Sequence, residues 1–138
     1  IGDRLSKALG PMVHVYGTLK APVHAKNLVD TIKDIKNTYN NPFVISMDAC
    51  LGSYKAIGNI NIENKPLQPG AALSKDLPAI GNLSITGTVN IAGALPFFIL
   101  QNTRLYEVMM LVDTISNGIL QAFDKLHGLS LAENSKLL

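Results

Sequence analysis

The sequence has little cysteine, little charge and no long apolar run. Its one cysteine, Cys50, excludes an internal disulfide framework and a cysteine-rich zinc site, and a lone thiol fits a reducing compartment. No stretch reaches the roughly 20 uninterrupted apolar residues that span a bilayer. The nearest candidate, residues 91–100, contains Gly93 and Pro96, and we expect it to be buried. These absences predict a cytoplasmic protein with no membrane partner.

Charged residues make up only 16% of the chain, below the usual quarter. The 12 basic and 10 acidic residues give a net charge of +2, and neither sign gathers in a run of the kind that holds a phosphate backbone. Nucleic acid is therefore not an expected partner. Because 47% of the residues are hydrophobic, a large part of the chain must be buried, some of it between subunits. We expect a homo-oligomer, most simply a dimer.

The length of 138 residues is that of one domain, and we expect residues 1–138 to form a single one. The chain opens on Ile1-Gly2-Asp3-Arg4, without Met and without a basic or apolar signal segment. We therefore expect the natural protein to have an N-terminal segment that precedes this chain.

Hydrophobic periodicity in the first third predicts an α/β arrangement. Residues 12–16 alternate as in a strand, and the apolar positions of residues 25–39 recur every three or four residues, as in an amphipathic helix. Residues 43–47 are almost continuously apolar, which is typical of a strand buried on both faces. Strand, helix and strand in this order predict a right-handed βαβ unit.

The remaining two thirds also mix strands and helices. Residues 56–62 and 83–89 read as further strands, the first of them weaker. A short helix with Pro96 in its first turn is expected next. A long helix with one apolar stripe then begins near Leu105 and is expected to end at Gly128, before a frayed tail or docking segment.

Asp48 is the leading candidate for a functional residue. It directly follows the apolar strand 43–47, and open α/β sheets place their ligand crevice at the carboxyl ends of strands. The alternative interpretation is that Asp48 caps the turn that follows. A lone carboxylate does little acid–base work, so a second group is required. Asp3, at what looks like another strand end, is the candidate; the alternative is a solvated terminal residue.

Three other side chains are candidates for contacting a substrate. Thr18 lies in the loop that leaves the first predicted strand, and His24 follows that loop, just before the helix. His24 can act there as a base or a metal ligand, or make only an ordinary polar contact. Lys75 follows a Pro-Gly segment without phosphate-loop spacing and can orient a carbonyl or carboxylate. A catalytic divalent metal usually needs three protein ligands, so two candidates, His24 and Asp48, predict no metal, and no cofactor is expected.

Five segments, taken in order, carry a family resemblance. They are residues 15–25, 47–52, 69–78, 84–90 and 100–105. Together they closely resemble the YyaC-type sporulation proteins of spore-forming Firmicutes, although no one segment would be specific alone.

The resemblance implies a three-layer α/β/α fold with a mostly parallel mixed sheet. This peptidase-like (phosphorylase/hydrolase-like) fold is similar to that of the germination protease, which degrades small acid-soluble spore proteins, and of the hydrogenase maturation peptidases. Those relatives place acidic residues at strand ends, and Asp48 matches the second of them. The acidic pair is regarded as an aspartic-type site in the germination protease, whereas acidic and histidine groups bind a metal in the hydrogenase peptidases. The fold alone therefore does not choose between the two chemistries.

The start of the chain departs from the family pattern. Such proteins read Ile-Gly-Thr-Asp-Arg, then a Ser/Thr-Gly-Asp segment and Leu-Gly-Pro, before a helix. Here Arg4 is followed directly by Leu5, and residues 5–10 look like the end of that helix. We therefore expect a loop with the family's first acidic residue to be missing after Arg4, and the junction to be mobile without substrate.

Two functions from different classes fit these observations. The first is a sporulation-associated peptidase, located in the cytoplasm of the forespore or mother cell. In it, Asp48 and an acidic partner polarise a water molecule against a carbonyl of a peptide or protein substrate, by aspartic-type or metal-assisted chemistry. The second is a non-catalytic sporulation factor that keeps the peptidase fold as a binding or oligomerisation module.

Overall fold

A computed structural model describes residues 1–10, 13–70 and 77–134. Chain contacts divide these residues into a larger unit, residues 23–111, and a smaller unit, residues 1–22 with the chain from Val112 onward. The expectation of a single domain stays a prediction. The elements are the helices α1 (Gly2–Ala8), α2 (Leu28–Thr38), α3 (Pro96–Gln101) and α4 (Leu105–Asn134), the 3₁₀ helix η2 (Tyr54–Ala56) and the strands β1 (Ile45–Gly52), β2 (Ile60–Glu63) and β3 (Leu83–Ile91).

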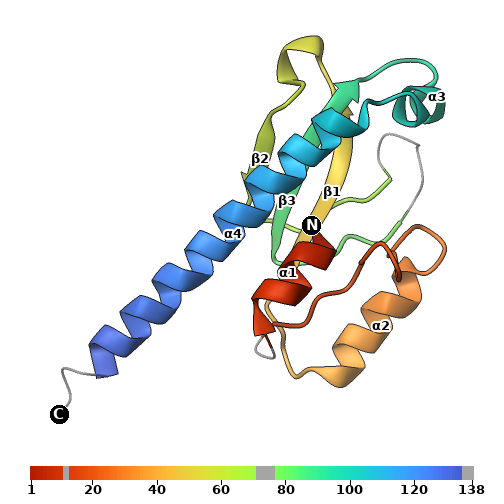
Figure 1. Ribbon diagram of the computed structural model, residues 1–138. Coiled ribbons are helices and arrows are strands. Elements are labelled where there is room, and N and C mark those ends of the chain that lie inside the picture. The colour runs from red at the N-terminus through yellow and green to blue at the C-terminus, as the bar shows by residue number, and fades with distance from the viewer. Residues whose placement is uncertain (11–12, 71–76, 135–138) are drawn as a thin grey trace. The chain divides into compact units, whose positions relative to one another are not determined.

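The larger unit is built on a mixed sheet of three strands in the order β1–β3–β2 (Figure 1). The central strand β3 is parallel to β1 and antiparallel to β2. Ile85 and Val89 of β3 are buried on one face, and Ser84 and Thr88 are buried on the other. Because both faces of β3 are covered, a β-branched sequence suits it. The α/β class and the mixed sheet are confirmed, with one parallel and one antiparallel pair among the described strands.

The first turns of α4 pack on the apolar face of the sheet through a glycine. A Cβ atom at Gly87 would lie 3.2 Å from Cδ1 of Leu111. The missing side chain therefore lets the helix approach the backbone of β3 closely. Leu111 is buried by this contact.

Helix α2 confirms the amphipathic pattern, although it begins three residues later than predicted. Leu28 and Ile35 are its buried residues, as the spacing requires. Ahead of the helix the chain forms a turn, in which the N–H of His24 donates to Oδ1 of Asn27 over 2.7 Å. The helix ends before Asn41, whose φ of 52° is incompatible with its continuation.

The predicted strand 12–16, and with it the βαβ unit, is wrong where the structure describes it. Residues 13–18 form no strand and take part in no β-ladder of the described residues, and Met12 lies outside them. Alternation specifies which side chains share a face. It does not supply the neighbouring strand that the backbone N–H and C=O groups need.

The long helix α4 was predicted to end at Gly128, and this is also wrong. The helix continues through that residue to Asn134. An isolated glycine costs a helix only about 1 kcal/mol relative to alanine, which good helix formers on either side offset. The short helix that begins at Pro96 is confirmed as α3. No helix in the described part of the chain is both long and apolar enough to cross a membrane.

The Arg4–Leu5 junction lies inside a helix. Helix α1 runs across it without interruption, and the N–H of Leu5 donates to the carbonyl of Ile1 over 3.1 Å. The side chain of Leu5 is buried. The junction is therefore helical, and an additional loop at this point of a longer parent protein stays a prediction.

Gly81 provides a test of packing in the larger unit. Its φ is +96°, and an added Cβ would overlap Oγ of Ser46 and lie 3.0 Å from the carbonyl of Val44. The Ser46 hydroxyl is held in place, because it donates to the carbonyl of Ile80 over 2.7 Å. We expect Gly81→Ala to lower the free energy of unfolding by about 2–4 kcal/mol, measured by urea denaturation.

The matched control for this substitution is Gly58→Ala. Gly58 has a similar φ of +87°, but an added Cβ would meet nothing within 4 Å. Only the backbone term, about 1–2 kcal/mol, is expected there. Equal losses in the two variants would contradict the packing at Gly81.

Candidate functional site

Asp48 lies inside a strand, not at its carboxyl end as predicted. It is the fourth residue of β1 (Ile45–Gly52) and pairs in register with Thr86 of β3. The regular ladder continues two residues further, to an irregularity between Cys50 and Leu51. The change from apolar residues to a carboxylate therefore marks a polar position on one face of β1. It does not mark the end of the strand, as the sequence predicted.

A row of polar side chains crosses the sheet at Asp48. Asp48 of β1 is in register with Thr86 of β3, and Thr86 is in register with Asn61 of β2. Residues in register project to the same face of a sheet, and neighbouring strands lie about 4.8 Å apart. The row therefore presents a carboxylate, a hydroxyl and an amide on one face. We call these three residues the polar row.

The neighbouring rows on this face are also polar, but they are engaged in hydrogen bonds. Sγ of Cys50 lies 3.5 Å from Oγ1 of Thr88, and Oγ of Ser84 donates to the carbonyl of Glu63 over 3.4 Å. In contrast, the side chains of Thr86 and Asn61 have no hydrogen-bond partner among the described residues. The polar row thus keeps donors and acceptors available for a ligand.

The electrostatic environment of Asp48 disfavours its charged form. Solvent reaches part of the residue, yet the protein around the carboxyl desolvates it and raises the pKa of Asp48 above its ordinary value of 3.8. The N–H of Ala49 donates to Oδ1 of Asp48 over 2.8 Å, which lowers the pKa and offsets part of this shift. A carboxyl with a raised pKa that solvent still reaches is suited to proton transfer.

Asp3 lies in the first turn of α1 in the smaller unit, not at a strand end. Its Oδ2 accepts the N–H of Leu19 over 2.7 Å. Thr18 lies in the same turn of chain, where its Oγ1 accepts the N–H of Ala21 over 3.1 Å. The structure thus brings Asp3 and the Thr18 loop together, and both side chains help to hold the loop in shape.

Two further features fix this part of the smaller unit. An added Cβ at Gly2 would overlap the carbonyl of Gly17, so only glycine allows the close approach of α1 to the loop. Arg4 and Asp113 form an ion pair between α1 and α4. Neither the glycine contact nor Asp113 had a local signal in the sequence, because each depends on residues distant along the chain.

The other predicted site residues are not brought to Asp48 by any described contact. His24 is an exposed residue in the turn before α2, and its backbone N–H is the group that is bonded. Lys75 lies outside the described residues. No group of three His, Cys, Asp or Glu side chains in the described ranges could hold a metal ion.

Comparison with known proteins shows which family the chain belongs to. Residues 1–118 match the family described as "Protein of unknown function (DUF1256)". The chain belongs to this family. The matched residues include Asp3 and Asp48. Together with the relative described next, this match confirms the predicted YyaC-type relationship.

One curated relative of this DUF1256 chain is "Uncharacterized protein YyaC" of Bacillus subtilis (strain 168). The two are 47% identical over 119 residues, which is 86% of this chain and 58% of the relative. The chain therefore spans well under two thirds of the length of that relative. No solved structure matches the chain.

Thr86 and Asn61 are not among the site residues that the sequence predicts. Thr86 lies in the predicted strand 83–89, where Ser84, Thr86 and Thr88 alternate with apolar residues. That alternation indicates a polar face on a buried strand and was the available signal for Thr86. Asn61 carried no comparable signal, because its place beside Thr86 depends on the pairing of β2 with β3.

Proposed function

We propose that this DUF1256 chain is a peptidase-like hydrolase of sporulating cells, with Asp48 as its acid–base group. The observation that carries the proposal is the polar row, in which a partly desolvated carboxyl stands beside a free hydroxyl and a free amide. Peptide hydrolysis needs a group that takes a proton from water and returns it to the leaving amine. A carboxyl with a raised pKa can do both.

The remaining members of the polar row would bind the peptide. Thr86 can donate its hydroxyl proton to a peptide carbonyl, and the amide of Asn61 can both donate and accept. A three-layer, peptidase-like α/β/α fold is part of this proposal. The parallel pairing of β1 with β3 and the resemblance to sporulation proteins support it. A second acidic group stays a prediction, since Oδ2 of Asp3 already accepts the N–H of Leu19.

A non-catalytic binding module is the second candidate function. The engagement of Asp3 and Thr18 in the loop of the smaller unit favours it, because these side chains then serve structure. The polar row would bind a peptide without cleaving it. The two functions differ in whether the bound peptide changes covalently.

The direct test uses the purified chain and small acid-soluble spore proteins as substrates. Mass spectrometry is expected to detect new peptide termini with the wild-type chain and none with an Asp48→Asn chain. An Asp30→Asn chain is the matched control, because Asp30 is an exposed aspartate of α2 that lies 3.8 Å from Lys33. Binding of the spore protein by wild type without any cleavage would favour the binding module.

Thr86→Val tests the role of the polar row. Valine has nearly the shape of threonine but no hydroxyl, so a hydrogen bond to the substrate is lost while the strand is preserved. We expect kcat/KM to fall about tenfold, because one such bond is worth about 1.4 kcal/mol. The control is Thr38→Val at the end of α2, which lies outside the sheet. Equal rates for wild type and Thr86→Val would remove Thr86 from the site.

A further inference from the structure

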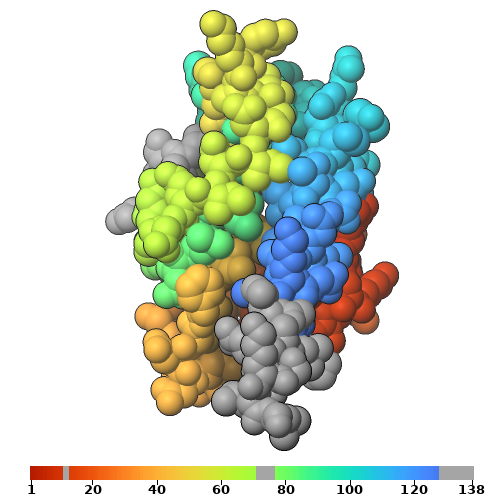
Figure 2. Space-filling view, turned by 90° about the vertical axis from the view of Figure 1, so that its left-hand side faces the viewer, coloured from red at the N-terminus to blue at the C-terminus, as the bar shows by residue number. Residues whose placement is uncertain are grey.

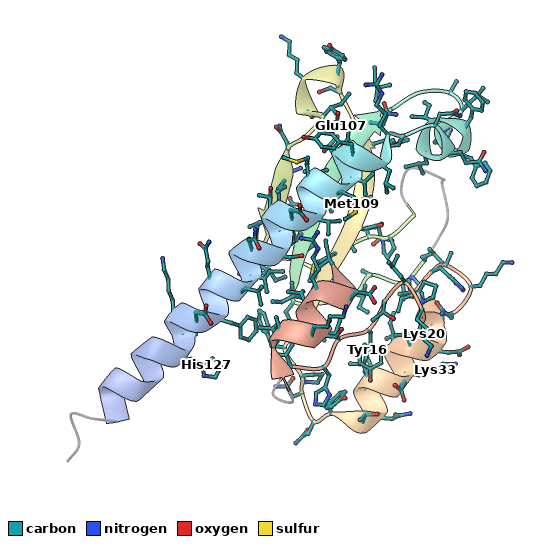
Figure 3. The ribbon with its side chains drawn as sticks, in the orientation of Figure 1. Tyr16, Lys20, Lys33, Glu107, Met109 and His127 are labelled. Carbon is teal, nitrogen blue, oxygen red and sulfur yellow. The ribbon has the colours of Figure 1, made fainter. Side chains whose placement is uncertain are left out.

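Large apolar side chains are exposed along α3 and at the start of α4. We call six of them the α3–α4 patch: Leu95, which precedes α3, Phe97 and Phe98 of α3, and Leu105, Tyr106 and Met109 of α4. Their exposed fractions run from 39% to 73%. Figure 3 shows Met109 near the beginning of α4, and in Figure 2 the first turns of that helix form part of the molecular surface. The expectation that residues 91–100 are buried is therefore wrong for Leu95, Phe97 and Phe98.

The α3–α4 patch is held in place by the fold. Residues 102–104 join the two helices, and Oγ1 of Thr103 donates to the carbonyl of Ile99 over 2.9 Å. The same oxygen accepts the side-chain amide of Asn90, at the end of β3, over 3.1 Å. The junction is thus tied to the sheet. Leu111 packs on the sheet at Gly87, whereas Leu105, Tyr106 and Met109 of the same helix are exposed.

The composition of the α3–α4 patch is that of an interface core. The chain has four Phe, four Tyr and four Met, and four of these twelve residues are in the patch. Aromatic residues and Met are enriched at the centres of protein interfaces, where charged residues are depleted. No charged residue occurs from Leu77 to Thr103. No charged side chain on α3 therefore favours its exposure to water.

The size of the α3–α4 patch matches one half of a dimer interface. Large apolar side chains expose about 150–200 Å² each when fully free, so this patch leaves roughly 500 Å² or more of apolar surface in water. A standard interface covers about 800 Å² on each partner, of which about 65% is apolar in homodimers, or about 520 Å². Exposed apolar patches of about 300–600 Å² are often functional even on monomers, so the α3–α4 patch is large enough to be a binding surface.

We propose that a second copy of this chain covers the α3–α4 patch across a two-fold axis. The charges at its rim suit such self-recognition. Arg104 and Glu107 are exposed at the start of α4, and neither forms an ion pair with a described residue. In a two-fold interface a patch meets its own copy, so Arg104 of each copy can face Glu107 of the other. This proposal does not depend on the hydrolase activity.

Sedimentation equilibrium of the purified chain, at about 1–100 µM, tests the proposal. The wild type is expected to dimerise in this range. Phe97→Glu is expected to weaken the dimer at least tenfold, because it buries a carboxylate at the centre of the interface. Phe43→Glu is the matched control, since Phe43 is 69% exposed, like Phe97 at 63%, and lies outside the patch. It is expected to leave the dimer unchanged.

Charge reversal at the rim adds a second measurement. Arg104→Glu and Glu107→Arg are each expected to weaken the dimer, and the double variant is expected to restore it, with circular dichroism confirming the fold of each. A monomeric wild type at 100 µM, or equal dissociation by Phe43→Glu, would overturn the proposal. So would binding of a monomeric wild type to phosphatidylcholine–phosphatidylglycerol vesicles that Phe97→Glu abolishes, because the occupant would then be lipid.

Discussion

Replacing Asp48 by asparagine is expected to slow peptide cleavage severely and to stabilise the folded chain at neutral pH. The amide keeps an oxygen that can accept the N–H of Ala49, so the hydrogen bond of the strand survives. It has no proton to exchange with water or with a leaving amine. General acid–base catalysis contributes about 10²- to 10⁴-fold, and kcat/KM is expected to fall by that factor.

The stability effect follows from the direction of the pKa shift. The pKa of Asp48 in the folded chain lies above its ordinary value of 3.8, because desolvation disfavours the carboxylate. Well below pH 3.8 the carboxyl is neutral in both states and carries no penalty. As the pH rises through the folded pKa, the unfolded state is favoured because it ionises more easily, and stability is lost. Asparagine does not ionise, so its advantage appears only as the pH rises.

Urea denaturation of wild type and Asp48→Asn between pH 3 and 7 measures this difference. The two free energies of unfolding are expected to converge at the acidic end and to separate in favour of Asp48→Asn toward neutrality. Asp30→Asn serves again as the control, since Asp30 is an exposed aspartate in the first turn of α2. An Asp48→Asn chain that is less stable at every pH would show that the charged form contributes to the fold.

Ile85→Ala is expected to cause the largest loss of stability among single substitutions in the sheet. Ile85 lies in the central strand β3 and is only 5% exposed. Removing its side chain leaves a cavity between well-packed neighbours and costs about 2–5 kcal/mol. Urea denaturation monitored by circular dichroism measures the change in the free energy of unfolding.

The control for Ile85 is the isoleucine directly opposite it. Ile62 of β2 is in register with Ile85, but it is 65% exposed. Ile62→Ala removes the same atoms from a side chain that is mostly in water, and we expect a loss of less than about 1 kcal/mol. A loss at Ile62 as large as that at Ile85 would show that β2 is covered by protein in solution.

The helices could be predicted from the sequence because their signals are local. The stripe of α2, with Leu28 and Ile35 on its buried side, repeats within eleven residues. Pro96 marks the start of α3 in the same way. Such signals need no knowledge of the rest of the chain.

The strands and the site were only partly predictable, because they depend on pairing. The apolar run before Asp48 correctly indicated a strand, but its end could not be located without the register to Thr86. Residues 13–16 alternate equally well and form no strand, since no described segment pairs with them. Asn61 lies beside Thr86 because β2 pairs with β3, and 19 residues separate these two strands in the chain.

The uncharged segment of the larger unit has a consequence for ionic strength. Residues 77–103, which include all of β3 and α3, contain no ionisable side chain. Salt acts on stability mainly by screening charges, and residues 77–103 have no charges that salt could screen. Asp48 therefore faces a partner strand that can neither neutralise nor repel it. The carboxylate is disfavoured by the loss of water around it, and a pH dependence of this origin persists in concentrated salt, where one that arises from ion pairs fades.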